Sequence, residues 1–406
     1  MQLRGILFLS LCLISLNLFA QDSTATKIHL EDVSIDFLFN YYEQDGIHSP
    51  VTGGQGTEKL TNTAPSIIVN IPLDTKRSLS YSGGFDYYTS ASSDNINNPY
   101  LYADHVSSAS ANDIRVYSNL GFKQKNKDKK TSYGVNMGLS FEFDVASVSI
   151  GSSYSKQSRD ENKEFSIKGS YYFDSWKLIY PIEHRNASVS PLNSDQRHSI
   201  NLSMVESWVM NKRMTASVNL DLVSQMGLLS TPFHRVYLNN NTDALDSKIE
   251  LLPSFRFKVP LGFRYNYYIA DFLLLNAYYR FYWDSWNVIG NTVQIDLPIK
   301  VKNFMRIYPF YRFHHQLAAK YFAPYAQHTV TDAFYTSDFD LSGFASHKFG
   351  LGLGFSPLYG IFHFKSKNEK RNNMLKSIDL RYAHYIRNDG LRANIYSIAF
   401  SYLIKR

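Results

Sequence analysis

Charged side chains recur at alternate positions in the C-terminal half of this 406-residue chain, within stretches that also alternate between polar and apolar residues. Successive side chains of a β-strand point to opposite faces, so residues two apart share a face. This reasoning places the following residues on one polar face: Arg256, Lys258, Arg264, Arg280, Asp284, Asp296, Arg306, Arg312, His314 and Arg381. Most of them are cations, and a cationic wall beside water would attract small polar or anionic solutes.

The polar positions of the N-terminal half are mainly acidic. They include Asp36, Asp86, Glu142, Glu206 and Asp221, interrupted by Arg115 and Lys168. One interpretation is an electric field across a water-filled lumen. The other is a network of ion pairs that fills a closed interior, in which Arg280 pairs with Asp284 or Asp296. The sequence leaves both open.

The residues that enzymes use are present but do not form a recognisable catalytic motif. Ser230 and His234 are the nearest serine–histidine pair, and they flank Pro232 in what we expect to be a loop. Asp338 and Asp340 with a histidine would resemble a rim protease, but the sequence fixes no distance between them. We therefore predict no enzymatic activity and no catalytic residue.

No metal or other cofactor is predicted either. His314 and His315 are adjacent, so they would face opposite sides of a strand. His328 and Asp332 have a helical spacing in an expected loop, which is weak evidence. The only cysteine is Cys12, within the expected signal peptide, so a mature chain would offer no thiolate.

The elements that carry these residues show period-two alternation. In Thr131 to Phe143, Tyr133, Val135, Met137 and the later apolar residues alternate with small and polar ones. A strand of about 9–11 residues crosses a bilayer when it is tilted. One face of such a strand would contact lipid and the other a polar lumen.

The pattern predicts an all-β fold, a transmembrane antiparallel up-and-down barrel of about 16 strands, with 14–18 possible. The expected strands lie near 32–43, 64–73, 78–90, 113–124, 131–143, 147–156, 164–173, 198–209, 214–226, 254–267, 272–283, 288–298, 304–316, 347–356, 375–387 and 391–404. Short turns would lie in the periplasm with both chain ends, and long loops outside. The basic stretch 357–374 is an exception that could hide another hairpin.

The N-terminus predicts export. Arg4, an apolar run and Ala20 indicate a signal peptide over 1–20, leaving residues 21–406 as a single barrel domain. The chain contains 30 Tyr and 28 Phe, and its mean hydropathy is −0.27. We expect an outer-membrane location, with lipid, lipopolysaccharide and the barrel assembly machinery as partners. The oligomeric state stays open.

Aromatic residues near strand ends suit the interfacial girdles of a barrel. They are Tyr41, Tyr87, Trp208, Tyr267, Trp283, Trp286 and Tyr311. The lysines Lys125, Lys127, Lys129 and Lys130 suit a solvated turn better than a nucleic-acid site, so no nucleic-acid partner is expected.

Several short sequence motifs between residues 230 and 354 resemble those of a known family. They include Ser230–Tyr237 (STPFHRVY), Leu252–Arg256 (LPSFR), Tyr279–Trp286 (YRFYWDSW), Tyr308–Arg312 (YPFYR) and Ser337–Ser342 (SDFDLS), with Val106–Ala111 (VSSASA) upstream. This set of motifs resembles a domain-of-unknown-function family of predicted Gram-negative outer-membrane β-barrels. The resemblance implies the fold, but no catalytic residue and no substrate. The sequence therefore favours a pore or transport-related barrel, with a closed barrel of structural, surface-contact or partner-docking role as the alternative.

Overall fold

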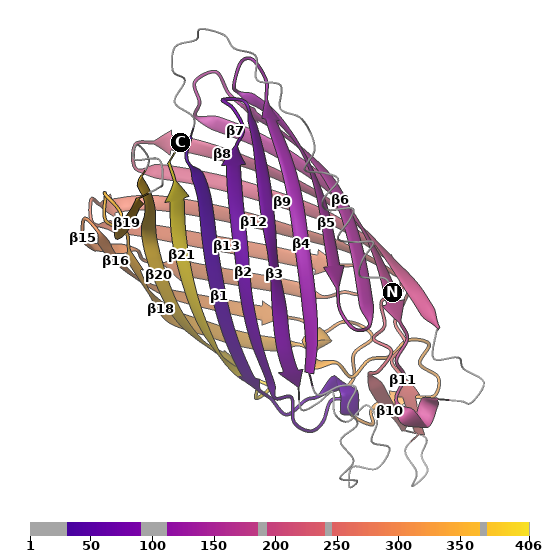
Figure 1. Cartoon of the computed structure of the whole chain (residues 1–406). Coiled ribbons are helices and arrows are strands. Elements are labelled where there is room, and N and C mark those ends of the chain that lie inside the picture. The colour runs from indigo at the N-terminus through magenta and orange to yellow at the C-terminus, as the bar shows by residue number, and fades with distance from the viewer. Residues whose placement is uncertain (1–30, 91–111, 186–192, 240–245, 366–371, 406) are drawn as a thin grey trace.

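The wall of the protein is one antiparallel sheet whose first and last strands pair with each other. The computed structural model describes residues 31–90, 112–185, 193–239, 246–365 and 372–405, so the expected signal peptide lies outside the described residues. The wall strands are β1(Val33–Asp45), β2(Leu60–Pro72), β3(Arg77–Ser90), β4(Asn112–Lys125), β5(Thr131–Phe141), β6(Val145–Gln157), β7(Lys163–Lys177), β8(Ser194–Asn211), β9(Met214–Gly227), β12(Phe255–Ala270), β13(Leu273–Asp284), β14(Ile289–Asp296), β15(Ile299–Lys302), β16(Met305–Gln316), β18(Phe344–Phe355), β19(Phe362–Lys365), β20(Asn372–Arg387) and β21(Arg392–Ile404). Pairing of β1 with β21, Phe37 opposite Phe400, closes the barrel (Figure 1).

These segments make 16 wall strands, as the alternation predicted. β14 and β15 form one strand interrupted at Leu297–Pro298, because both pair with β13 and β16. β18 and β19 likewise form one interrupted wall strand, because both pair with β20, so the described part of the stretch 357–374 adds no further hairpin to the 16 strands. Most predicted strand boundaries agree with the observed ones within about four residues, the accuracy expected of such patterns.

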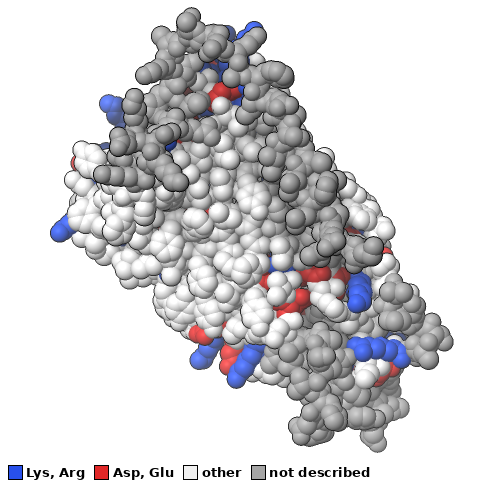
Figure 2. Space-filling view, in the orientation of Figure 1, with Lys and Arg blue, Asp and Glu red and all other residues white. Residues whose placement is uncertain are grey.

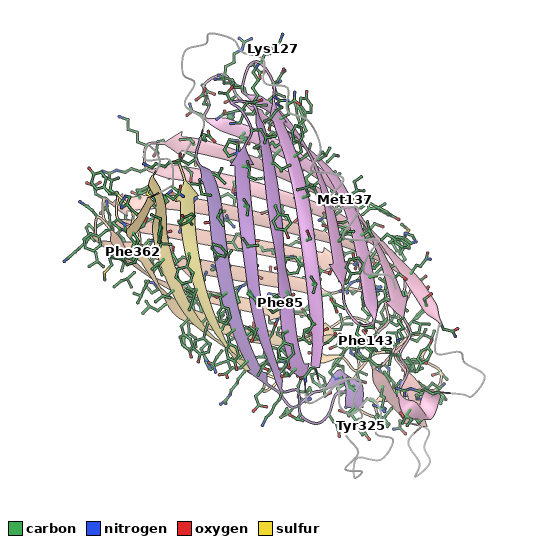
Figure 3. All side chains as sticks on the ribbon, viewed as in Figure 1. Phe85, Lys127, Met137, Phe143, Tyr325 and Phe362 are labelled. Carbon is green, nitrogen blue, oxygen red and sulfur yellow. The ribbon has the colours of Figure 1, made fainter. Side chains whose placement is uncertain are left out.

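The two faces of the wall differ as a membrane requires. Along β5 the side chains of Tyr133, Val135 and Met137 are exposed on the outer face, while the alternate residues Gly134 and Asn136 face the interior. Figure 3 shows Met137 and Phe85 on the barrel wall, with Lys127 at the short-turn end. In Figure 2 the visible charged groups gather toward the two ends of the barrel, and the described surface between them is largely uncharged. The chain is thus a transmembrane barrel.

Among the described residues, no helix is long and apolar enough to cross a membrane.

The inner face of β18 includes glycines that the side chains of β16 cover. A Cβ atom added to Gly352 would lie 1.9 Å from the Tyr308 ring, and one on Gly350 would lie 2.5 Å from the Phe310 ring. Arg381 in turn stacks on Phe310, 3.9 Å from its centroid. The rings of Tyr308 and Phe310, two inward residues of β16, therefore lie against the wall.

The long loops pack into a structure of their own, which we call the loop cap: residues 46–59, 178–185, 228–254 and 317–343, so far as they are described. It contains a three-stranded sheet of β10(Arg235–Asn239), β11(Asp246–Ile249) and β17(His328–Thr329). Short 3-10 helices η1(Pro50–Thr52), η3(Ile182–His184) and η4(Phe339–Leu341) join it. Two buried apolar clusters lie here or at its junction with the wall: Leu252, Trp286, Val288 and Ala319, and Val236, Leu238 and Tyr335.

The loop cap bridges the mouth of the barrel. η1 lies between β1 and β2, whereas β10 lies between β9 and β12, half-way around the ring of 16 strands. Arg235 of β10 nevertheless donates from Nη1 to the Val51 carbonyl of η1 at 2.9 Å, and Gly53 lies against the Tyr237 ring. Figure 1 shows β10, β11 and the helix of residues 50–52 beyond the same end of the barrel. The contact therefore spans the opening.

Candidate solute path through the barrel

A row of inward side chains crosses five strands near mid-wall. Arg264 is the cross-strand neighbour of Tyr278, and Tyr278 is the neighbour of Gln294. Gln294 then lies opposite Arg312, and Arg312 lies opposite Lys348. The alternate residues of these strands, such as Phe263, Tyr279 and Val293, are exposed on the lipid side. This register brings together cations that are up to 84 residues apart in the sequence.

We call five inward cations the cationic wall: Arg264, Arg280, Arg312, Lys348 and Arg381. Among the described residues, no carboxylate lies within ion-pair distance of any of them. Arg264, Arg280 and Arg381 instead lie over the rings of Tyr278, Tyr282 and Phe310. Asp296, which was predicted on the same face, accepts hydrogen bonds from Gln294. Unpaired cations need water or anions as partners, since burying them alone is costly.

Lys348 was not among the predicted site residues. It lies two residues from both Ser346 and Gly350 and therefore on the same inward face of β18. Extending the period-two pattern along this strand would have identified it.

Three other predicted site residues, Arg256, Asp284 and Arg306, are engaged in ion pairs. Arg256 binds Asp284 with an Nη2–Oδ2 distance of 2.5 Å, and Lys258 is the cross-strand neighbour of Asp284. Arg306 binds Asp379 at 2.7 Å near the short-turn end. The suggested pairing of Arg280 with Asp284 or Asp296 is wrong, because Arg256 occupies Asp284 and no ion pair joins Arg280 to Asp296. His314 shares a hydrogen bond with Thr292, Nδ1 to Oγ1, at 2.8 Å.

The opposite side of the barrel carries mostly small inward side chains, and some of its charged residues form ion pairs. The inward residues of β5 and β6 include Gly134, Gly138, Gly151 and Ser149, where an added Cβ on each glycine would meet serine or asparagine side chains. Near the capped end, Arg115 approaches both Asp86 and Glu142, and the Tyr88 hydroxyl donates to Glu142 at 3.2 Å. Asp221 and Glu206 have no ion pair with another described residue. The network interpretation therefore fits this cluster, and the field interpretation fits the cationic wall.

The loop cap reaches the inward side chains at the end of the path. Arg387, at the end of β20, donates to Asp340 at 2.6 Å and to the Phe339 carbonyl at 2.7 Å. Gln316, at the end of β16, donates to the Asp340 carbonyl at 2.9 Å. His48 stacks on Phe339 with ring centroids 3.7 Å apart. η4 is thus held between the barrel rim and the loop that joins β1 to β2.

Glu58, at the edge of the loop cap, makes its packing sensitive to pH. Burial, followed by the negative charge of Asp340, raises the pKa of Glu58 to about 7. A carboxyl whose pKa is raised by folding stabilises the fold while it is protonated, and this contribution is lost as pH rises through the folded pKa. Between pH 5 and pH 8 we therefore expect the segment 46–58 to loosen.

The measurement is amide hydrogen exchange of residues 46–58 at several pH values, after correction for intrinsic exchange. In Glu58→Gln we expect a smaller pH dependence, and Asp338 should account for what remains. Burial and the negative charge of Asp340 raise the pKa of Asp338 to about 6, although His234 acts in the opposite direction. Equal pH dependence in wild type and Glu58→Gln would contradict the assignment.

One prediction about a side chain in the capped region is corrected by the structure. Trp286 is not a girdle residue: it is 3% exposed in the cluster with Leu252, and its ring carries Arg256 at 4.2 Å. The Ser230 hydroxyl accepts from the Leu252 amide at 2.8 Å, and His234 faces Glu250. Of the girdle residues, Tyr87, Trp283 and Tyr311 are exposed as predicted.

The wall, the lumen and the bridged mouth define a transmembrane β-barrel of the outer-membrane type with a folded loop cap. The chain belongs to the family described as "Protein of unknown function (DUF3570)", whose model matches residues 9–358. This confirms the resemblance that the sequence suggested. No curated protein matches the chain.

Solved structures with similar architecture are outer-membrane barrels. A bacterial polysaccharide outer membrane secretin matches at 10% identity and a TM-score of 0.43, over 91% of this chain and 98% of that one. The outer membrane protein OpdK of Pseudomonas aeruginosa matches at 8% and 0.39, over 92% and 99%. The siderophore receptor PirA of Acinetobacter baumannii matches at 10% and 0.45, over 89% of this chain and 54% of the receptor. Because these TM-scores lie below 0.5, we infer nothing further from them.

Proposed function

We propose that this protein is an outer-membrane pore that passes small polar solutes and prefers anions. The observation that carries the proposal is the cationic wall, whose five side chains face the lumen with no carboxylate in ion-pair contact among the described residues. Lumen cations of this kind raise the local concentration of anions and lower that of cations. The wall does not catalyse a reaction in this proposal.

The geometry of the lumen supports this role over that of a filled interior. Barrels of 16 strands are wide enough to hold an aqueous channel. The aromatic rings of Tyr308 and Phe310 lie against the glycines of β18, and serines and glycines line β5 and β6. Ion pairs that would fill a closed core are concentrated toward the two ends, as with Arg256–Asp284 and Arg306–Asp379.

The proposed setting follows from the chain ends. β1 begins and β21 ends at the short-turn side, opposite the loop cap. We place that side in the periplasm, after removal of residues 1–20 and insertion by the barrel assembly machinery. The loop cap then faces outward beside lipopolysaccharide, and solutes enter past it.

The test is conductance of the refolded mature protein in a planar bilayer under a salt gradient. Wild type is expected to show a reversal potential of anion-selective sign. Arg280→Gln together with Arg312→Gln should shift that potential toward zero, because two of the five wall cations are neutralised. The control is Lys127→Gln in the exposed turn of residues 126–130, which should leave selectivity unchanged. A cation-selective wild type, or unchanged selectivity in the double variant, would contradict the proposal.

The second candidate function is a closed barrel with a structural or partner-docking role. The contact of Arg235 with η1 across the mouth favours it. A silent bilayer, with folding shown by heat-shifted gel migration, would support this candidate over the pore.

A further inference from the structure

The loop cap buries a histidine and two carboxylates that face one another. His234 precedes β10, Glu250 follows β11 and Asp338 begins η4. One ligand atom from each lies within 4.8 Å of the other two. The residues come from the β9–β12 loop and the β16–β18 loop, so they join two separate parts of the loop cap. Sequence reasoning considered His234 and Asp338 separately, and only the fold places them together.

His234 offers a free nitrogen to this cluster. Its Nδ1 atom is buried and has no hydrogen-bond partner, although it lies 3.6 Å from Oε1 of Glu250. The side chain as a whole is 12% exposed. A buried ring nitrogen normally donates or accepts a hydrogen bond, so an orphaned one needs an explanation such as an ion.

The carboxylates are fixed and short of positive charge. The Glu250 side chain is 3% exposed and accepts from the Thr231 amide at 2.7 Å and the Thr336 hydroxyl at 2.5 Å. Asp338 accepts from the Asp340 amide at 2.9 Å. Arg387 forms its ion pair with Asp340 of η4 rather than with either of them. When both carboxylates are ionised, even a protonated His234 leaves this buried triad with a net negative charge.

We propose that His234, Glu250 and Asp338 bind a divalent transition-metal ion, with Zn²⁺ as the preferred ion. One imidazole and two carboxylates suit Zn²⁺, which commonly binds three protein ligands and leaves a position for water. The ion would supply the missing positive charge and connect the β9–β12 loop to η4. The proposed metal site is independent of the proposed pore, because metal binding does not require that the barrel conducts ions.

The alternative is a protonated His234 side chain that bridges the two carboxylates without a metal ion. It requires His234 Nδ1 to donate to one of them, whereas the 3.6 Å separation from Glu250 leaves it unbonded. The two arrangements differ in metal content, which can be measured directly.

The experiment uses the full mature barrel, refolded in detergent and purified without a polyhistidine tag. After treatment with a chelator and its removal, ZnCl₂ is titrated by calorimetry, and bound zinc is counted by elemental analysis. We expect one equivalent in wild type and affinity lowered by more than about tenfold in His234→Gln, Glu250→Gln and Asp338→Asn, since even second-shell changes cost about 10–100-fold. Two controls should bind like wild type: His363→Gln, an exposed residue at the short-turn end, and Glu142→Gln, in the carboxylate-only cluster with Asp113 and Asp144.

Folding of each variant is checked by heat-shifted migration, so that loss of binding is not loss of the barrel. Co²⁺ provides a second readout in wild type, since a ligand field of one nitrogen and several oxygens gives bound Co²⁺ a visible absorption spectrum. This spectrum should disappear when Zn²⁺ displaces Co²⁺. Absence of stoichiometric zinc in wild type would overturn the proposal, as would binding that survives in all three ligand variants. Because the assay records zinc and not current, its failure would leave the pore proposal standing.

Discussion

Replacing Asp284 with alanine is expected to lower the free energy of unfolding by about 3–5 kcal/mol, the usual cost of removing one partner of a buried ion pair. Asp284 is completely buried and accepts from Arg256, from the Tyr282 hydroxyl at 2.8 Å and from the amides of Trp286 and Val288. Its loss leaves the Arg256 guanidinium without its carboxylate and two amides without an acceptor. The turn after β13 should loosen together with Trp286.

The measurement is urea unfolding in lipid vesicles followed by tryptophan fluorescence. Asp271→Ala provides a matched aspartate in the exposed turn between β12 and β13, where we expect little change. A difference between the two variants below about 1 kcal/mol, the range of an exposed ion pair, would show that the Asp284 network does not hold this rim together.

Replacing Gly352 with valine is expected to narrow the lumen. Its added Cβ would occupy space 1.9 Å from the Tyr308 ring, so the ring must rotate away from the wall and into the path. We expect a lower single-channel conductance and a loss of about 1–3 kcal/mol of stability from overpacking. Single-channel recording and the same unfolding assay measure both effects.

Gly169→Val is the matched control, because nothing lies within 4 Å of a Cβ at that position. Combining Gly352→Val with Tyr308→Ala should restore conductance, since the displaced ring is then absent. If Gly352→Val conducts like wild type, the ring does not border the conducting path.

The strands were predictable from sequence because their signal is local. Each wall strand repeats the alternation seen in Tyr133, Val135 and Met137, and a bilayer on one side with a polar lumen on the other enforces it along the whole chain. Even the interruption at Pro298 lies at a predicted strand end.

Ion pairing and the loop cap were not predictable in the same way. Arg280 and Asp284 share a face, but four residues of an extended strand separate them by about 13 Å. Asp284 instead meets Arg256 from the neighbouring strand, and that pairing depends on register. The meeting of His234, Glu250 and Asp338 depends on how two long loops fold against each other, for which the sequence contains no periodic signal. Trp286 was assigned to a girdle because it follows a strand end, where both a girdle and a cap core would place tryptophan.

The contact between Val51 and Arg235 has a consequence for the order in which the protein forms. The two residues are 184 positions apart, and they meet only when strands on opposite sides of the ring are held at a fixed separation. Closing so long a loop costs conformational entropy that a few contacts cannot repay before the wall exists. We therefore expect the loop cap to assemble after β1 has paired with β21. A chain arrested with an open wall would carry unpacked long loops, which are readily cleaved by proteases, so protease resistance of these loops reports completed closure.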